Sequence, residues 1–212
     1  MRLICLTALA FCWSASAAQP TNDFANKSLL VENYKLAGNK QMHVVRVAAR
    51  YFDVRVLSPL VSLEKSVTAQ AFVNPERRPR GYYLEEYLAR FGAELVISGG
   101  YIDSYSPPTS LGLVKSAGTI VSPAHNSWLT EAIFCSDEGK VTIDLFRSDL
   151  AANYRDCLQA GPLLLRQGKV PADFASHKSA GYLKLAGSVQ EQLFLCIASP
   201  DQLIMGITDK ID

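Results

Sequence analysis

The chain has 212 residues, of which 49% are hydrophobic and 19% are charged, and its formal net charge is +1. This length suits one domain with or without an extension, and the apolar content is sufficient for a substantial core. A charge this close to zero gives no general electrostatic attraction to nucleic acid or to an anionic membrane, so we expect neither as a partner.

The N-terminus has the three-part layout of a secretory signal peptide. A short basic start is followed by an almost wholly apolar run at residues 3–13 and by small residues at positions 15–18. The apolar run is too short to cross a bilayer, and no later segment is long and apolar enough to do so. We therefore expect cleavage after Ala17 or Ala18 and a secreted or periplasmic protein.

Loss of a signal peptide would leave three of the five cysteines. In an oxidising compartment Cys135 and Cys157 can pair, which leaves Cys196 in an apolar run. Three buried, reduced thiols are an equally good interpretation. A cysteine nucleophile is the least favoured one, because no spacing specifies a basic partner.

The first half of the chain predicts two short strands within residues 42–57. Apolar and charged side chains alternate over residues 52–56, which is the period of a half-buried strand. A helix is predicted at residues 82–91, with Gly92 as its C-terminal stop. This helix leads into a predicted strand at Leu95–Ser98.

The second half is a succession of predicted strands. Its apolar runs are bounded by glycine turns, and they lie in residues 130–146, 158–170, 179–187, 191–199 and 203–207. A hairpin turn is predicted at Asp137–Gly139, and further turns are predicted at Gly161–Pro162 and at Gly168. The expected fold class is α+β, with a mainly antiparallel mixed sheet and few helices.

Three segments in this order resemble the phosphodiester glycosidase domain family. They are "VISGGYID" with the later "LGLVKSAG", then "LQAGPLLLRQGK", then "SHKSAGYLKLAG". Members of that family show Asn-Gly-Gly-Phe-Phe after a strand, then Gly-Pro-x-Leu, then Arg-Thr-Ala and a closing Leu-Asp-Gly-Gly-x-Ser. The expected division of the chain is the signal peptide at residues 1–18, an N-terminal extension at 19–41 and, from the resemblance, a phosphodiester glycosidase-like domain at 42–212.

The chain departs from the family pattern at three places. Ser98 stands where the family has Asn, and Lys178-Ser179-Ala180 stands in place of Arg-Thr-Ala. The closing motif would begin near Asp212, where the sequence ends. The domain is therefore expected to be incomplete at its C-terminus, through truncation or through divergence.

The resemblance implies an exported hydrolase that cleaves a sugar–phosphate bond in a sugar phosphodiester or in a phosphate-containing glycan. The alternative is a non-catalytic glycan-binding or accessory module of envelope polysaccharide metabolism. Asp103 and Lys178 are the expected catalytic residues. The expected substrate-binding residues line the same motifs, and they are Ser98, Gly99, Gly100, Tyr101, Gly161 and His177. The resemblance implies no cofactor, and no residue spacing predicts a metal site.

Each of these residues also has a purely structural interpretation. Gly99 and Gly100 suit a strand exit with positive φ, although their N–H groups could also hold phosphate oxygens. Asp103 suits a turn, and as an acid at a sheet edge it suits proton transfer. Lys178 is either a solvated lysine or a phosphate contact without the two-pronged fork of an Arg.

Other polar residues are weaker candidates. His125 and His177 could carry protons or contact phosphate, but a lone histidine in a polar loop usually does neither. The basic loop at residues 77–80 is usually a solvated turn, with an anionic glycan contact as the minority interpretation. Gly161–Pro162 is expected to build a rigid turn beside the site rather than to take part in the chemistry.

Overall fold

A computed structural model describes residues 2–3, 28–36, 40–58, 88–89, 91–105, 108–170 and 190–211. Most of these residues belong to antiparallel strands, and the described helices are short. The expected antiparallel sheets with few helices are therefore confirmed, but the protein is better described as mainly β than as α+β. Within the described residues no helix is long and apolar enough to cross a membrane.

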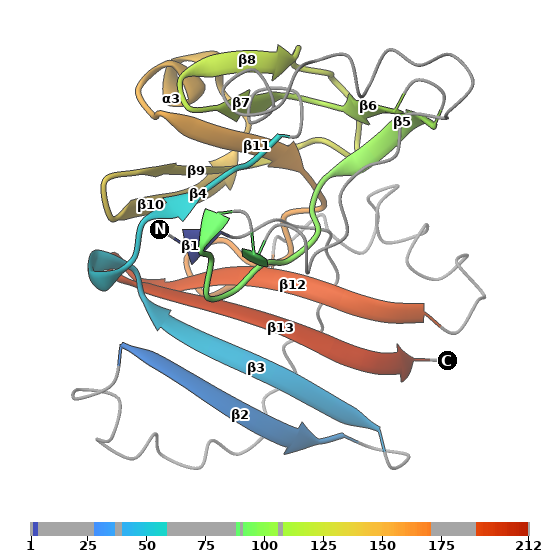
Figure 1. The fold of residues 1–212 in the computed structure, drawn as a ribbon. Helices are drawn as coiled ribbons and strands as arrows, with labels where there is room; N and C mark the ends of the chain where they lie inside the picture. The colour runs from blue at the N-terminus through green and yellow to red at the C-terminus, as the bar shows by residue number, and fades with distance from the viewer. Residues whose placement is uncertain are drawn as a thin grey trace.

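One layer of the molecule is a four-stranded antiparallel sheet in the order β12-β13-β3-β2 (Figure 1). Its strands, in chain order, are β2 (Leu29–Lys35), β3 (Gln41–Ala48), β12 (Gln190–Ser199) and β13 (Gln202–Ile211). The pairing joins the two ends of the chain, because β13 from the C-terminal end lies against β3 from the N-terminal end. Strand β2 lies within the expected N-terminal extension and pairs along its whole length with β3.

The second layer is a five-stranded antiparallel sheet in the order β10-β9-β11-β7-β8. Its strands are β7 (Val114–Ser116), β8 (Thr119–Ser122), β9 (Ala132–Asp137), β10 (Lys140–Leu145) and β11 (Asp156–Ala160). The predicted hairpin turn is confirmed, since Asp137 pairs with Lys140. Both central residues have positive φ, 43° at Glu138 and 81° at Gly139, as a tight two-residue hairpin turn requires.

Four further strands complete the described β structure. β5 (Tyr101–Tyr105) and β6 (Pro108–Leu111) form an antiparallel hairpin, and β1 (Arg2–Leu3) pairs in parallel with β4 (Val54–Arg55). In Figure 1 the β5–β6 hairpin lies beside the five-stranded sheet. The 3₁₀ helix η3 (Ala49–Tyr51) connects the end of β3 to β4, and the α-helix α3 (Ser148–Ala152) connects β10 to β11.

The main hydrophobic core lies between the two sheets. Val47, Leu203 and Met205 from the four-stranded sheet belong to the same buried cluster as Phe134 and Leu158 from the five-stranded sheet. The predicted alternation at residues 52–56 is confirmed, because residues 52, 54 and 56 are buried while 53 and 55 are only half-buried. Apolar surface is thus removed from water on one face of each layer, which is the main driving force for this packing.

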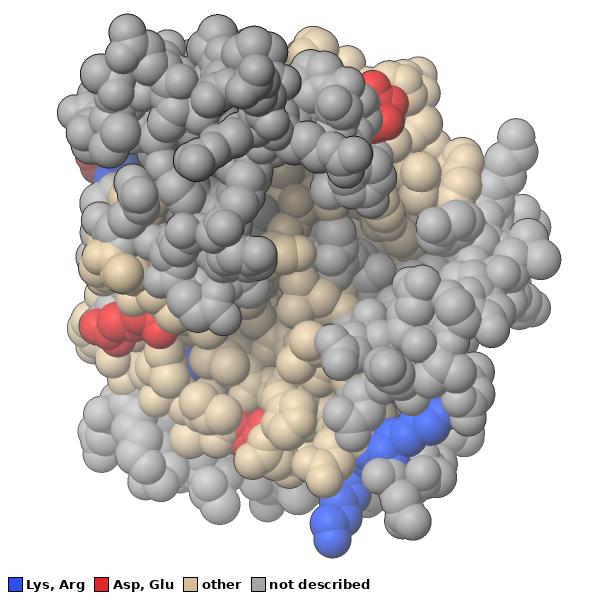
Figure 2. Space-filling view, turned by 45° about the vertical axis from the view of Figure 1, so that its right-hand side comes forward, with Lys and Arg blue, Asp and Glu red and all other residues tan. Residues whose placement is uncertain are grey.

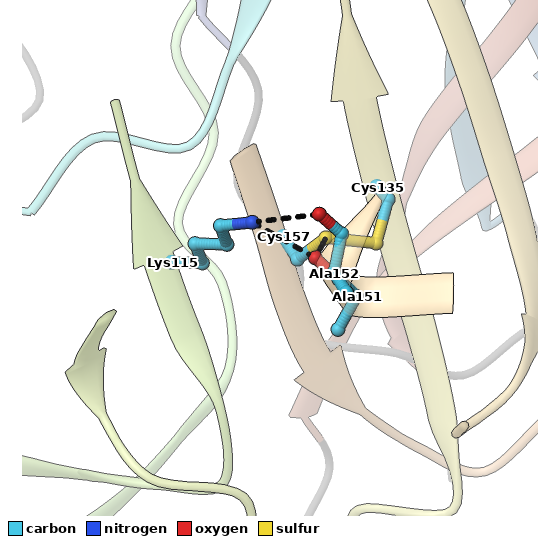
Figure 3. Close-up of a disulfide and its surroundings, with 5 residues drawn as sticks. All are labelled: Lys115, Cys135, Ala151, Ala152 and Cys157. Atoms are coloured by element: carbon cyan, nitrogen blue, oxygen red, sulfur yellow. Dashed lines mark hydrogen bonds between the residues drawn. A yellow bond between two sulfur atoms is a disulfide. The ribbon is translucent and has the colours of Figure 1, made fainter. Parts of the chain in front are cut away.

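A second cluster covers the other face of the five-stranded sheet under α3. Cys135 and Cys157 are directly opposed on β9 and β11, and they form a disulfide. This settles the alternatives that the sequence left open for the two cysteines. Lys115 reaches from β7 to the end of α3 and donates to the carbonyls of Ala151 at 3.0 Å and Ala152 at 3.4 Å (Figure 3). A lysine at this end of a helix satisfies carbonyls that have no partner within the helix.

The predicted strand at Leu95–Ser98 is wrong, because these residues lie outside every strand of the structure. Leu95 and Ile97 nevertheless pack against the main core. The apolar pattern therefore predicted the burial of these residues correctly, but it could not show whether they pair with another strand through hydrogen bonds. The predicted helix end is supported, since Gly92 has a φ of 59° after the helical residues 88, 89 and 91.

Other expectations lie outside the described residues. They are the basic loop at residues 77–80, the start of the predicted helix, and the predicted strand at 179–187. The partner of β12 in the structure is β13, which follows it after a tight connection. The turn at Gly168 is confirmed, since Arg166 and Lys169 form a bridge around it.

Candidate functional site

The glycine pair precedes a strand instead of following one. Gly99 and Gly100 are half-buried, and Gly100 leads into β5 with a φ of 73°. A Cβ at Gly100 would lie 3.2 Å from Leu158 Cδ1, so packing as well as backbone conformation favours glycine here. Ser98, which precedes the pair, is exposed.

Asp103 lies within β5 and not beyond a strand end, so its interpretation as a turn residue is wrong. The β5–β6 pairing shifts register between Ile102 and Ser104, which makes Asp103 the extra residue of a β-bulge. Its side chain is exposed. Bulges interrupt pairing and change the direction of a side chain, and they are common beside active sites.

The Gly161–Pro162 segment follows directly after β11. Gly161 is buried, and a Cβ on it would lie 2.9 Å from the carbonyl oxygen of Leu129. This approach of two backbones leaves no space for a side chain, which is a structural reason for glycine at this position. Gly161 therefore has the scaffold position that its sequence context predicted, and a direct contact with substrate stays a prediction.

One hydrogen bond joins the two glycine-bearing segments. The hydroxyl of Tyr101 donates to the carbonyl oxygen of Gly161 at 2.7 Å, across 60 residues of sequence. The structure thus brings together the segment before β5 and the segment after β11. A tyrosine hydroxyl in this half-buried position both fixes the ring and satisfies the Gly161 carbonyl.

Beside these segments lies a buried amide that sequence analysis missed. Gln159 on β11 is 1% exposed, and its Oε1 accepts from the backbone N–H of Leu113 at 2.9 Å and of His125 at 3.1 Å. Its Nε2 donates to the carbonyls of His125 at 2.8 Å and Thr130 at 2.6 Å. Fully bonded buried amides fix the segments around them, so Gln159 holds the loop at 123–131 against the sheet. A polar residue within the apolar run before Gly161 was the available signal.

A carboxylate that the sequence did not single out also lies at this place. Glu131 is half-buried just before β9, and its Oε1 accepts from the backbone N–H of Leu163 at 3.0 Å. Its backbone nitrogen would lie 3.3 Å from a Cβ on Gly161. Nothing in the sequence around Glu131 distinguishes it from other acidic residues that precede a strand.

The remaining candidates divide into two groups. Lys178 and His177 lie outside the described residues, so the structure does not place them relative to Asp103. His125 is exposed, and the bonds described for it to Gln159 and Thr130 use its backbone atoms. Its position beside the site is thus a consequence of loop anchoring, and a chemical role for its ring stays a prediction.

Figure 2 turns the right-hand side of Figure 1, where β5 and β6 lie, toward the viewer. The described surface on this face is hollowed near its middle, and most of it belongs to residues other than Lys, Arg, Asp and Glu. The charged side chains visible on this face lie at its left edge, at its upper right and in its lower half, away from the hollow. A ligand in the hollow would therefore meet mainly uncharged groups among the residues that the structure describes.

Two packed antiparallel sheets and a meeting point of two glycine-bearing segments define the class of protein: a disulfide-bonded, mainly β protein with a candidate site beside one sheet. A family model described as phosphodiester glycosidase matches residues 91–210, which is more than half of the chain. The chain therefore belongs to the phosphodiester glycosidase family, as its motifs indicated. No curated protein matches the chain.

Proposed function

We propose that this protein is an exported hydrolase that cleaves the sugar–phosphate bond of a sugar phosphodiester or of a phosphate-containing glycan. The observation that carries the proposal is the family match over residues 91–210, which includes Gly99, Gly100, Asp103 and Gly161. The hydrogen bond from Tyr101 to Gly161 supports it, because two motifs that are distant in sequence meet at one place.

The chemistry assigns different tasks to the candidate residues. Hydrolysis requires a group that moves a proton, and the exposed carboxylate of Asp103 on its bulge is suited to this role. A phosphate leaving group needs little protonation, but its negative charge must be stabilised. Lys178 would supply a cation there, and the N–H groups of Gly99 and Gly100 would supply hydrogen bonds.

Export is part of the proposal and has two supports. The first is the signal-peptide layout of the N-terminus, with its small residues before position 19. The second is the disulfide between Cys135 and Cys157, since disulfides persist mainly in oxidising compartments. A substrate outside the cytoplasm, such as an envelope glycan, agrees with both.

A non-catalytic glycan-binding module is the second candidate function. Two replacements favour it, Ser98 where the family has Asn and Lys178 where it has Arg. Serine has fewer hydrogen-bonding groups than Asn, and Lys lacks the bidentate fork of Arg. Both changes would weaken positioning of a phosphodiester while leaving a glycan surface in place.

The test is hydrolysis of a synthetic sugar phosphodiester by the wild type and by Asp103→Asn, Lys178→Ala and Lys178→Arg. Asp103→Asn should lower turnover by about 100- to 10,000-fold, the usual contribution of general acid–base catalysis. Lys178→Ala should weaken substrate binding, and Lys178→Arg should match or improve on the wild type. Asp149→Asn, which removes an exposed acid from α3, is the control for loss of charge.

Melting temperatures measured alongside separate chemistry from folding. Because Asp103 is exposed, its replacement by Asn should leave the melting temperature close to that of the wild type. Equal rates for Asp103→Asn and wild type would remove Asp103 from the mechanism. A folded wild type that binds glycan but shows no turnover would support the non-catalytic module instead.

A further inference from the structure

The segment at residues 161–163 is held from two sides. On one side its Gly161 carbonyl accepts from the hydroxyl of Tyr101 at 2.7 Å. On the other side the N–H of Leu163 donates to Glu131 Oε1 at 3.0 Å. Pro162 between them has no N–H. The segment is therefore positioned by two side chains, and neither Pro162, which has no N–H, nor Leu163, whose N–H is bonded to Glu131, offers a backbone donor to a phosphate.

Glu131 itself is attached to a rigid part of the sheet. Its backbone carbonyl accepts from the N–H of Phe146 at 2.7 Å. The preceding residue, Thr130, is 1% exposed, and its hydroxyl donates to the carbonyl of His125 at 2.7 Å. Because the backbone of Glu131 is held in this way, only the torsions of its side chain lie between the sheet and Leu163. The carboxylate can therefore hold Leu163 in one place.

We propose that Glu131 is a positioning residue of the candidate site, an inference that rests on the proposed function. Its carboxylate holds Leu163, which keeps the Gly161 carbonyl against Tyr101 and so fixes the segment that carries Gly99 and Gly100. A carboxylate repels phosphate, so its contact with a backbone N–H suits it to this role better than to substrate binding. Displacements of about 1 Å at a site can lower a rate by about 100-fold.

The test compares Glu131→Met, which keeps the length of the side chain but removes both oxygens, with Glu131→Gln, which keeps one acceptor. Four quantities are measured for each: kcat, KM, the melting temperature and the exchange rate of the Leu163 amide hydrogen. Glu131→Met should lower kcat/KM by about 10- to 100-fold and should speed exchange at Leu163. Glu131→Gln should keep kcat/KM and the Leu163 exchange rate close to the wild-type values, because its carbonyl oxygen can accept the same hydrogen bond. Asp149→Asn again controls for loss of an exposed charge.

The outcomes are distinct. Unchanged Leu163 exchange in Glu131→Met, or unchanged kinetics with faster exchange, would overturn the positioning role. Equal losses of kcat/KM in Glu131→Gln and Glu131→Met would also overturn the positioning role, since the charge of Glu131 and not its hydrogen bond would then matter. If Glu131→Met lost activity only because less of it is folded, while kcat and KM of the folded protein were unaltered, Glu131 would be a structural residue and not a positioning one. If the proposed function itself is wrong, the wild type will show no turnover, and this result is distinct from every outcome above.

Discussion

A Cβ added to Gly161 would lie closer to its surroundings than one added to Gly100. The nearest atom to a Cβ built on it is the Leu129 carbonyl oxygen at 2.9 Å, and the next is the Leu129 carbonyl carbon at 3.1 Å. Both are backbone atoms, so no side-chain rotation can relieve the contact. The hydroxyl of Tyr101 donates to the carbonyl oxygen of Gly161 itself, so this hydrogen bond would shift with the Gly161 backbone.

Gly161→Ala should therefore destabilise the fold by about 1–3 kcal/mol, the usual cost of forcing extra atoms into a packed site. The matched control is Gly168→Ala, where nothing lies within 4 Å of the added Cβ and only the positive φ of 76° opposes alanine. That strain costs about 1–2 kcal/mol. Denaturant unfolding of both variants measures the difference. A smaller loss for Gly161→Ala than for Gly168→Ala would show that the backbone of residues 129–131 adapts easily.

Asp156 is a buried charge away from the candidate site. It is 1% exposed on β11, and its Oδ1 accepts from the N–H of Ala117 at 2.7 Å. Arg55 Nη1 lies 3.6 Å from Oδ2, which has no hydrogen-bond partner among the described residues. Burial raises the pKa of the Asp156 carboxyl above 3.8, although the Ala117 N–H and the Arg55 charge oppose that shift.

The sign of the pH dependence follows from that direction. The folded state binds the Asp156 proton more tightly than the unfolded state does, so protonation stabilises the fold and this gain is lost as pH rises through the raised pKa. The unfolding free energy of the wild type should therefore increase relative to that of Asp156→Asn as pH falls from neutral to 3.8. Parallel urea titrations across that range provide the measurement. The opposite trend would mean that the attraction of Arg55 outweighs the effect of burial.

At the scale of elements, sequence patterns predicted the turns and strands that are determined by residues close together in the sequence. The turn at Glu138–Gly139 and the apolar strands β9, β12 and β13 follow from glycine placement and from runs of apolar residues. Residues 95–98 were mispredicted because burial against the core and pairing in a sheet produce the same apolar pattern. The contact of Tyr101 with Gly161 depends on how the chain folds across 60 residues, and local patterns carry no such information.

The disulfide joins two strands of one sheet and closes a loop that contains β10 and α3. Cys135 and Cys157 are separated by 22 residues, and both are fully buried. Replacing both with Ala should lower the unfolding free energy by about 2–4 kcal/mol, because the unfolded chain gains freedom. Denaturant midpoints of the two proteins measure the loss. The folded wild type should resist mild reductant, since neither sulfur is accessible. Equal midpoints would contradict a stabilising bond.

At the scale of the whole molecule, the family match and the folded unit have different extents. The match begins at residue 91, whereas the four-stranded sheet draws β2 and β3 from residues 29–48. Strand β3 lies between β2 and β13, so it is internal to its sheet. Without it, one whole side of β13 would lose its backbone partners, and the core would lose Val47.

A fragment of residues 91–212 should therefore fail to fold alone, while a chain of residues 19–212 should fold. In the fragment, Leu203 and Met205, which are 0% and 2% exposed in the full chain, would lose the neighbouring strand that helps to bury them. Loss of burial costs about 25 cal/mol for each Å² of apolar surface, and a domain's net stability is only about 5–15 kcal/mol. Circular dichroism during heating compares the fragment with the longer chain directly. A cooperative transition in the 91–212 fragment at the temperature of the longer chain would contradict this prediction and would make the N-terminal strands an accessory.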